Sequence, residues 1–184
     1  DVASEADAIV DLHTGGPYML SHTRFTDGDE DSRRLARAFG IDPIVADGEV
    51  ADDDTGDVSG KLREVAAAEG IPAITPELAH SREIVADSVA QGVSGVENVL
   101  AAVGVLDEPV PENDPAVGTE KTPVFTAESG LFRSADVAVG DRVAAGQAIG
   151  EVFGPTSYEV LQTIEAEREG LLLSLNRGST VMEG

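Results

Sequence analysis

Apolar residues in the first hundred positions follow two alternating patterns, which predict strands and helices in turn. Short apolar runs at 8–12, 41–46 and 71–77 have the length of buried strands. Between and after them, apolar residues at helical spacing predict helices over 29–39, 59–69 and 81–103. Gly40 and Gly70 follow the first two helices, where a helix commonly ends. This order of elements predicts a parallel α/β layered domain.

Polar segments join these elements. We expect loops at 17–29 and 47–57, the second with the acidic run Asp52 to Asp54. That run resembles a calcium-binding loop only loosely, because the required glycine and terminal glutamate are not in place. Glu83 is expected in the first turn of the third helix, where it would complement the helix dipole. Gly92 and Gly95 mark a place where that helix can kink.

The pattern changes after position 107, where prolines and acids replace the periodic apolar residues. We therefore divide the chain into an α/β domain at 1–110, a linker at 111–121 and a β domain at 122–184. The last part contains a weak repeat, in which 125–146 resembles 164–184. Each half places a strand, a glycine turn, a second strand and a hairpin.

Charge narrows the set of partners. The chain has 35 acidic and 12 basic residues and a net charge of -23, so we expect neither nucleic acid nor an anionic membrane as a partner. With 41% hydrophobic residues it should fold, and with no cysteine it has neither disulfides nor thiolate ligands. A composition with many acidic residues and only two lysines resembles that of proteins adapted to molar salt. At such salt concentrations the Debye length is about 3 Å, so repulsion among the acids is screened. No apolar run reaches the roughly 18 residues of a membrane span, so a cytoplasmic location is expected.

The candidate chemistry lies at the ends of two predicted strands. Asp11 and His13 alternate along the first strand and should share a face, with Leu12 pointing into the core. An imidazole beside a carboxylate suits a metal site, since the carboxylate can fix the ring tautomer. Glu77 ends the third strand and is a candidate general base. Read without other information, these residues also fit a polar pair and an exposed strand-end acid.

Other residues offer weaker candidates for the same site. His22 and His80 are alternative metal ligands, although each position is more typical of a loop or a helix-cap histidine. Arg33, Arg34 and Arg37 are expected to pair with surface acids rather than with substrate.

Three segments together carry a resemblance to a known family: Ile9 to Gly16 with its Asp-Leu-His, Ile71 to Leu78, and Gln91 to Leu106. Their order and spacing resemble the succinylglutamate desuccinylase/aspartoacylase family of zinc carboxypeptidase-like hydrolases. The resemblance implies that His13 is a zinc ligand, that Glu77 acts on the attacking water, and that Asp11 supports His13 from behind. It implies a zinc-dependent deacylase, with one zinc ion per site, that cleaves the amide of an N-acyl amino acid or a similar small amide.

The sequence departs from that family at two places. The His-x-x-Glu motif that supplies the first two zinc ligands is absent, so we expect a C-terminal portion of a longer protein that binds zinc poorly by itself. Leu78, Ala79 and His80 stand where the family has a glycine run. The alternative function is a catalytically incomplete module with a structural or assembly role, and homo-oligomer formation stays open.

The β domain carries a second resemblance, to the barrel-sandwich fold of biotinyl and lipoyl carrier domains. Such carriers modify a lysine at the hairpin between their two halves. Here that hairpin, 154–159, has no lysine, so a carrier function is excluded. The desuccinylase/aspartoacylase family has a β domain of this kind after its catalytic domain. The expected fold is therefore a partial zinc-carboxypeptidase-like α/β domain followed by a small barrel-sandwich.

Overall fold

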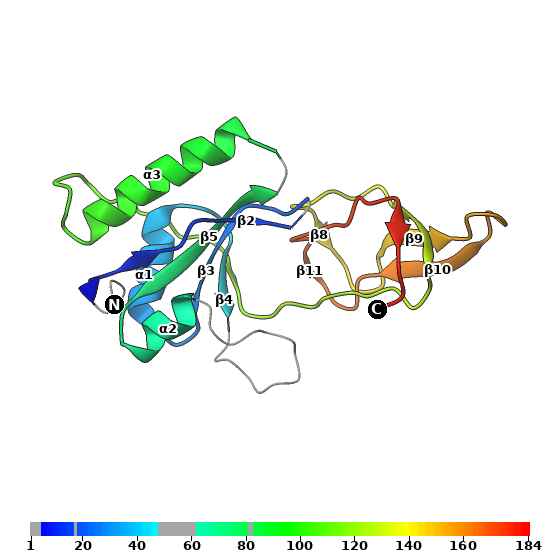
Figure 1. Ribbon diagram of the computed structural model, residues 1–184, viewed down its shortest axis with the longest axis horizontal. Coiled ribbons are helices and arrows are strands. Elements are labelled where there is room, and N and C mark those ends of the chain that lie inside the picture. The colour runs from blue at the N-terminus through cyan, green and yellow to red at the C-terminus, as the bar shows by residue number, and fades with distance from the viewer. Residues whose placement is uncertain (1–4, 17, 48–61, 81–82) are drawn as a thin grey trace. The chain divides into compact units, whose positions relative to one another are not determined.

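The computed structural model describes residues 5–16, 18–47, 62–80 and 83–184 (Figure 1). The chain forms two compact units, the first from 1–15 with 21–120 and the second from 16–20 with 121–184. Most of the predicted acidic loop at 47–57, and the predicted helix start at Ser59, lie outside the described residues.

The first unit is built on a mixed sheet. Its strands are β1 (Ile9–Val10), β2 (His13–Gly15), β3 (His22–Thr26), β4 (Ile44–Asp47), β5 (Ala73–His80) and β6 (Val117–Gly118). Their order is β1-β5-β3-β4-β6, and β2 pairs with β5 as well. β1 and β2 run parallel to β5, whereas β3 runs antiparallel to it. The prediction of a parallel sheet is therefore wrong, because a strand that the sequence did not indicate lies in its middle.

That strand is β3, which occupies part of the predicted loop at 17–29. Its sequence is His-Thr-Arg-Phe-Thr, and Thr23 and Phe25 point into the core with 0% and 3% exposure. Only one of its five residues is strongly apolar, so a search for apolar runs passes over it. Threonine and phenylalanine nevertheless favour strands, and Gly28, with φ of 79°, ends the segment in a turn.

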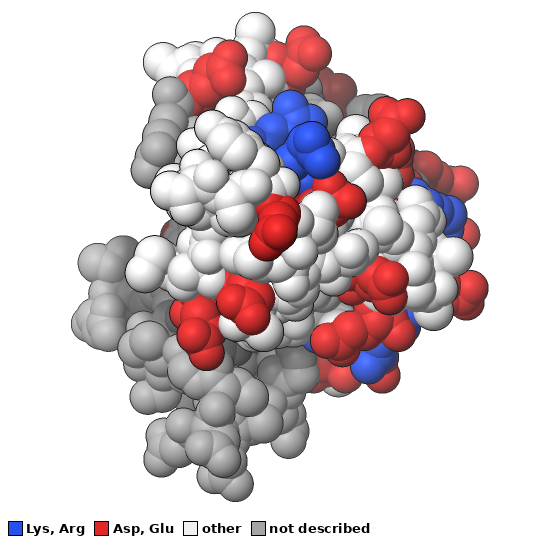
Figure 2. All heavy atoms as spheres, turned by 90° about the vertical axis from the view of Figure 1, so that its right-hand side faces the viewer, with Lys and Arg blue, Asp and Glu red and all other residues white. Residues whose placement is uncertain are grey.

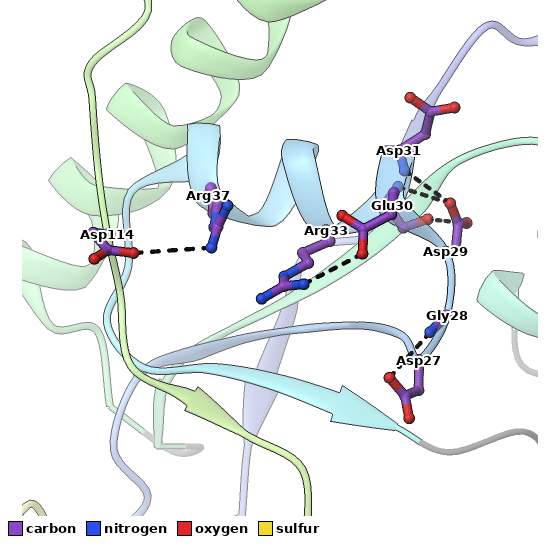
Figure 3. Close-up of polar contacts among 9 residues, drawn as sticks. Asp27, Gly28, Asp29, Glu30, Asp31, Arg33, Arg37 and Asp114 are labelled. Atoms are coloured by element: carbon purple, nitrogen blue, oxygen red, sulfur yellow. Dashed lines mark hydrogen bonds and ion pairs between the residues drawn. The ribbon is translucent and has the colours of Figure 1, made fainter.

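Helix α1 (Glu30–Phe39) begins at a well-formed cap, drawn in Figure 3. The Asp29 carboxylate accepts from the amides of Asp31 and Ser32 at 3.1 and 3.0 Å. Such a cap contributes about 0.5–2 kcal/mol to helix stability. The helix ends at Gly40, whose φ of 90° is readily adopted only by glycine.

The three arginines of α1 pair with acids, as predicted. The distances are 3.2 Å for Arg33–Glu30 and 3.8 Å for Arg37–Asp114, both drawn in Figure 3. Arg34 lies 3.7 Å from Asp31. All six side chains are at least one-third exposed, so each pair contributes little stability.

Helix α2 (Leu62–Ala68) is short, and helix α3 (Ala86–Ala102) begins later than predicted. Residues 83–85 are not helical, and Glu83 pairs with His80 at 3.0 Å instead of occupying the first helical turn. Gly92 and Gly95 lie on the buried side of α3. A Cβ at these positions would come within 2.9 Å of Leu78 Cδ1 and 2.5 Å of the Phe39 ring. These glycines therefore let α3 approach the sheet and α1 closely.

The two faces of the sheet are covered differently. On one face, a cluster of large side chains packs under α1 and α3: Phe25, Leu35, Phe39, Ile41, Ile44, Ile74 and Val99. On the other face a smaller cluster joins Ala66 of α2 to Ile71 and Ala73. The larger cluster makes the first face the main hydrophobic core of this unit.

The second unit contains β7 (Gly130–Ser134), β8 (Arg142–Val143), β9 (Ala148–Phe153), β10 (Val160–Glu165), β11 (Gly170–Leu171) and β12 (Thr180–Val181). They form an antiparallel sheet of order β10-β9-β7-β12 and a separate β8–β11 pair. None of the described residues of this unit is helical. Its core holds Val143, Ile149, Val152, Ile164, Ala166, Leu172 and Leu175. In neither unit does a described helix have the length and hydropathy needed to cross a membrane.

Candidate active site

Glu77 stands at the centre of the candidate site because of its place in the sheet. Its Cα pairs with His13 of β2 on one side and with His22 of β3 on the other. Residues that lie opposite one another on neighbouring strands project from the same face of a sheet. The register therefore places a carboxylate between two imidazole-bearing positions on three adjacent strands.

The surroundings of Glu77 are polar and largely buried. Glu77 is 8% exposed, so it is not the exposed strand-end acid that the sequence left open. Arg24 Nη1 lies 3.7 Å from Glu77 Oε1. One step along the face, Thr75 Oγ1 accepts a hydrogen bond of 3.2 Å from Nη1 of Arg63, which α2 supplies. Two guanidinium groups thus lie on the face of the sheet that carries Glu77, whereas the opposite face carries Ile74 and Phe25.

His13 and Asp11 come together at the edge of this face. His13 Nε2 lies 3.1 Å from Asp11 Oδ2, and the His13 side chain is half exposed. A carboxylate in this position orients the imidazole and leaves its other nitrogen, Nδ1, for a further partner. Leu12 was expected in the core, but it is 50% exposed. It lies between β1 and β2 at the edge of the sheet, where no described strand covers it.

A bulge in β5 follows Glu77 directly. The register passes from His13 opposite Glu77 to Gly15 opposite His80, so β5 has one residue more than β2 over this step. Ala79 takes up the difference with a φ of 57°, and its amide donates to Ser21 Oγ at 2.9 Å. Bulges of this kind often re-aim side chains beside functional sites. Alanine here adopts the left-handed backbone that glycine favours, at the position where the resemblance leads one to expect glycine.

The remaining candidates fall into two groups. His22 is 2% exposed and lies opposite Glu77 in the β3–β5 pairing. His80 contacts a different residue, with Nε2 at 3.0 Å from Glu83 Oε2. Nothing in the sequence pattern pointed to Arg63 or Arg24, and the pattern gave His22 little weight. The signal that would have found the latter two is the strand character of 22–26, since alternate residues of that strand share a face with Glu77.

The described residues do not form a complete metal site. A catalytic zinc ion has three protein ligands and one open position. Among the residues described, no three His, Asp or Glu side chains converge closely enough to hold a metal ion. His13, with Asp11 behind it, fits the part of a single ligand. The set as a whole does not fit a zinc ion.

Comparison with known proteins identifies the fold through solved structures. No family model matches the sequence, and no curated protein matches it either. The solved structures that align with the whole chain include three with TM-scores of 0.81 to 0.84. They are the apo form of the ectoine utilization protein EutE (DoeB) from Ruegeria pomeroyi (22% identity, TM-score 0.84), a succinylglutamate desuccinylase/aspartoacylase from Rhodobacter sphaeroides (20%, 0.82), and a succinylglutamate desuccinylase from Silicibacter sp. TM1040 (24%, 0.81).

The chain therefore has the fold found in structures of succinylglutamate desuccinylase/aspartoacylase proteins, as the sequence resemblance predicted. At 20–24% identity, the likeness establishes the fold alone. The chain covers 59% of the Ruegeria pomeroyi structure and 57% of each of the other two. It thus spans little more than half the length of these neighbours.

Proposed function

We propose that this chain contributes the base and one metal ligand to a zinc-dependent deacylase, which cleaves the amide of an N-acyl amino acid or a similar small amide. The observation that carries the proposal is the sheet register that sets Glu77 beside His13, with Asp11 behind the imidazole. The fold neighbours named as desuccinylase and aspartoacylase proteins support the reaction class. The alternative, a catalytically incomplete module, has no comparable support.

The residues of this chain would divide the work as follows. His13 would bind zinc through Nδ1 while Asp11 holds Nε2, and the other ligands would come from polypeptide outside these 184 residues. A zinc ion held in this way would supply Lewis acidity, which lowers the pKa of a bound water and polarises a carbonyl. Glu77 would accept the proton of that water and pass it to the leaving amine. Arg24, 3.7 Å away, would hold the Glu77 carboxylate in place.

The proposal also concerns the β domain, the cellular location and the adaptation of the protein to salt. We infer a barrel-sandwich β domain at 122–184 that has no carrier lysine. The stretch 111–121, expected to be a linker, carries β6 of the first unit's sheet. We also infer a cytoplasmic protein adapted to high salt. In support of the latter, acidic side chains are spread over the face shown in Figure 2 and greatly outnumber the lysines and arginines there.

The test uses a longer form of the protein that carries the remaining ligands. Glu77→Gln should retain about one zinc ion and lose about 10²–10⁴-fold in turnover, because the amide keeps the shape of glutamate without its basicity. His13→Ala should lose zinc and activity together. Elemental analysis and assays on N-acyl amino acids measure both quantities.

Glu97→Gln is the matched control, since Glu97 is an exposed acid on α3. It should leave zinc content and turnover unchanged. Near-normal turnover of the zinc-loaded Glu77→Gln variant on every substrate tried would show that Glu77 has no catalytic part.

A further inference from the structure

The pairing between β3 and β5 stops directly beside the candidate base. Its last pair is His22 with Glu77. If the strands continued in the same register, Leu20 would lie opposite Ala79. Leu20 belongs to the second unit instead, where its amide donates to Leu173 O at 2.9 Å. The last residues of β5 therefore extend beyond the described pairing with β3.

A serine side chain replaces the backbone partner at this point. Ala79 lies two positions beyond Glu77, and its amide donates to Ser21 Oγ at 2.9 Å in partly buried surroundings. In a regular antiparallel ladder, a backbone carbonyl of the neighbouring strand would accept this bond. A buried amide without an acceptor destabilises the fold, so the Ser21 hydroxyl stabilises the end of β5.

The bulge in β5 makes the geometry at Glu77 depend on this bond. Between Glu77 and His80 the register against β2 shifts by one residue, and Ala79 adopts a φ of 57°. A residue other than glycine keeps such a backbone conformation only where its surroundings hold it there. A slip of one residue would carry a side chain to the other face of the sheet. The hydrogen bond to Ser21 therefore fixes the backbone on one side of Glu77, while the regular pairing with β3 fixes it on the other.

We propose that Ser21 is a positioning residue for Glu77, which it serves by holding the Ala79 amide and with it the bulge. The inference rests on the proposed function in so far as Glu77 is the base. Two side chains then share the task of placing its carboxylate. Arg24 lies 3.7 Å from the carboxylate itself, and Ser21 acts through the backbone.

Ser32 provides a matched control, because it makes the same kind of bond near the other end of β5. Its Oγ accepts from the amide of Ala73 at 2.9 Å. Ala73 lies four positions before Glu77, where the pairing with β1 is regular. Ser32 is 1% exposed, so its loss should lower the melting temperature at least as much as the loss of Ser21.

The first measurement uses the 184-residue chain in molar potassium chloride and requires no activity. In Ser21→Ala, hydrogen exchange at the Ala79 amide should be at least about tenfold faster, and the carbon-13 signal of the Glu77 carboxyl should move. Ser21→Thr keeps a hydroxyl and should restore both. Ser32→Ala should speed exchange at Ala73 and leave the Glu77 signal in place.

The second measurement uses the longer form of the protein. Ser21→Ala should lower kcat by roughly 10–100-fold, because small displacements of a catalytic group have effects of this size. KM should stay within about twofold and zinc content should be unchanged, and Ser21→Thr should return kcat to within about threefold. Ser32→Ala should leave kcat unchanged. Ser129→Ala is a milder second control, since Ser129 Oγ accepts from the Glu183 amide at 3.0 Å in the second unit.

Three results would overturn the inference. The first is an unmoved Glu77 signal in Ser21→Ala, and the second is a Ser21→Thr variant that behaves like Ser21→Ala. The third is a kcat that Ser21→Ala leaves unchanged, or that Ser32→Ala lowers equally, in a protein where Glu77→Gln loses turnover. If Glu77→Gln keeps normal turnover, the proposed function fails, and the Glu77 signal in the 184-residue chain still decides whether Ser21 positions that carboxylate.

Discussion

The two faces of strand β5 show how differently neighbouring residues of one segment are used. Ile74 is fully buried and Leu78 packs beside it, both on the face covered by α1 and α3. Thr75 and Glu77 alternate with them and are also buried, yet on their face Thr75 accepts from Arg63 and Glu77 lies near Arg24. Both faces exclude water, but only one does so with apolar side chains.

That difference separates stability from chemistry. Burial of apolar area favours folding, whereas buried charges need partners and seldom add net stability. A sheet that carries a glutamate and two arginines on one face must therefore be stabilised mainly by the other face. Substitutions on the two faces should accordingly affect different measurements.

The largest effect on stability is expected on the apolar face. Ile74→Ala should lower the free energy of unfolding by about 2–5 kcal/mol, since it leaves a cavity among fully buried side chains. Ile84→Ala is the matched control, because Ile84 is 91% exposed and should change stability by less than about 0.5 kcal/mol. Denaturant unfolding in molar salt measures both. Equal effects of the two substitutions would contradict the assignment of the core.

Salt should raise the stability of the whole chain through its acidic surface, without changing the difference between the two faces of the sheet. The excess of acids over basic residues makes the folded chain repel itself, and screening relieves that repulsion. Thermal melts from dilute to molar potassium chloride should therefore show the melting temperature rising. The difference in stability between the wild-type chain and Ile74→Ala should stay nearly constant. A flat salt profile would refute adaptation to high salt.

The smallest effect is expected at the bulge after Glu77. Ala79→Gly should raise the free energy of unfolding by up to about 1 kcal/mol, because glycine adopts a φ of 57° without the steric penalty of alanine. Ala90→Gly, in the exposed part of α3, should have the opposite sign and lose about 1 kcal/mol. If Ala79→Gly destabilises the chain as much as Ala90→Gly does, the left-handed conformation of Ala79 is wrong.

The apolar face was easier to predict from the sequence than the polar one. The helix ending at Phe39, the strand ending near Glu77 and the long helix through Val99 all have clear periodicity, and the structure has them. β3 was missed because its polar residues form a buried face rather than a loop. Because β3 was missed, its antiparallel pairing with β5 was missed as well, and so was the place of His22 and Arg24 near Glu77. Asp11, His13 and Glu77 could be predicted as site residues because their types and order suit the chemistry. That His13 lies opposite Glu77 could be seen only from the strand pairing in the structure.

The most direct test of the central claim is the number of zinc ions bound by each form of the protein. Elemental analysis after dialysis should find much less than one zinc per 184-residue chain, because His13 is the one described residue that we propose as a ligand. The longer form should hold about one equivalent, which His13→Ala removes and Glu77→Gln does not. Tight, stoichiometric zinc in the 184-residue chain, or zinc in the longer form that is unaffected by His13→Ala, would contradict the account.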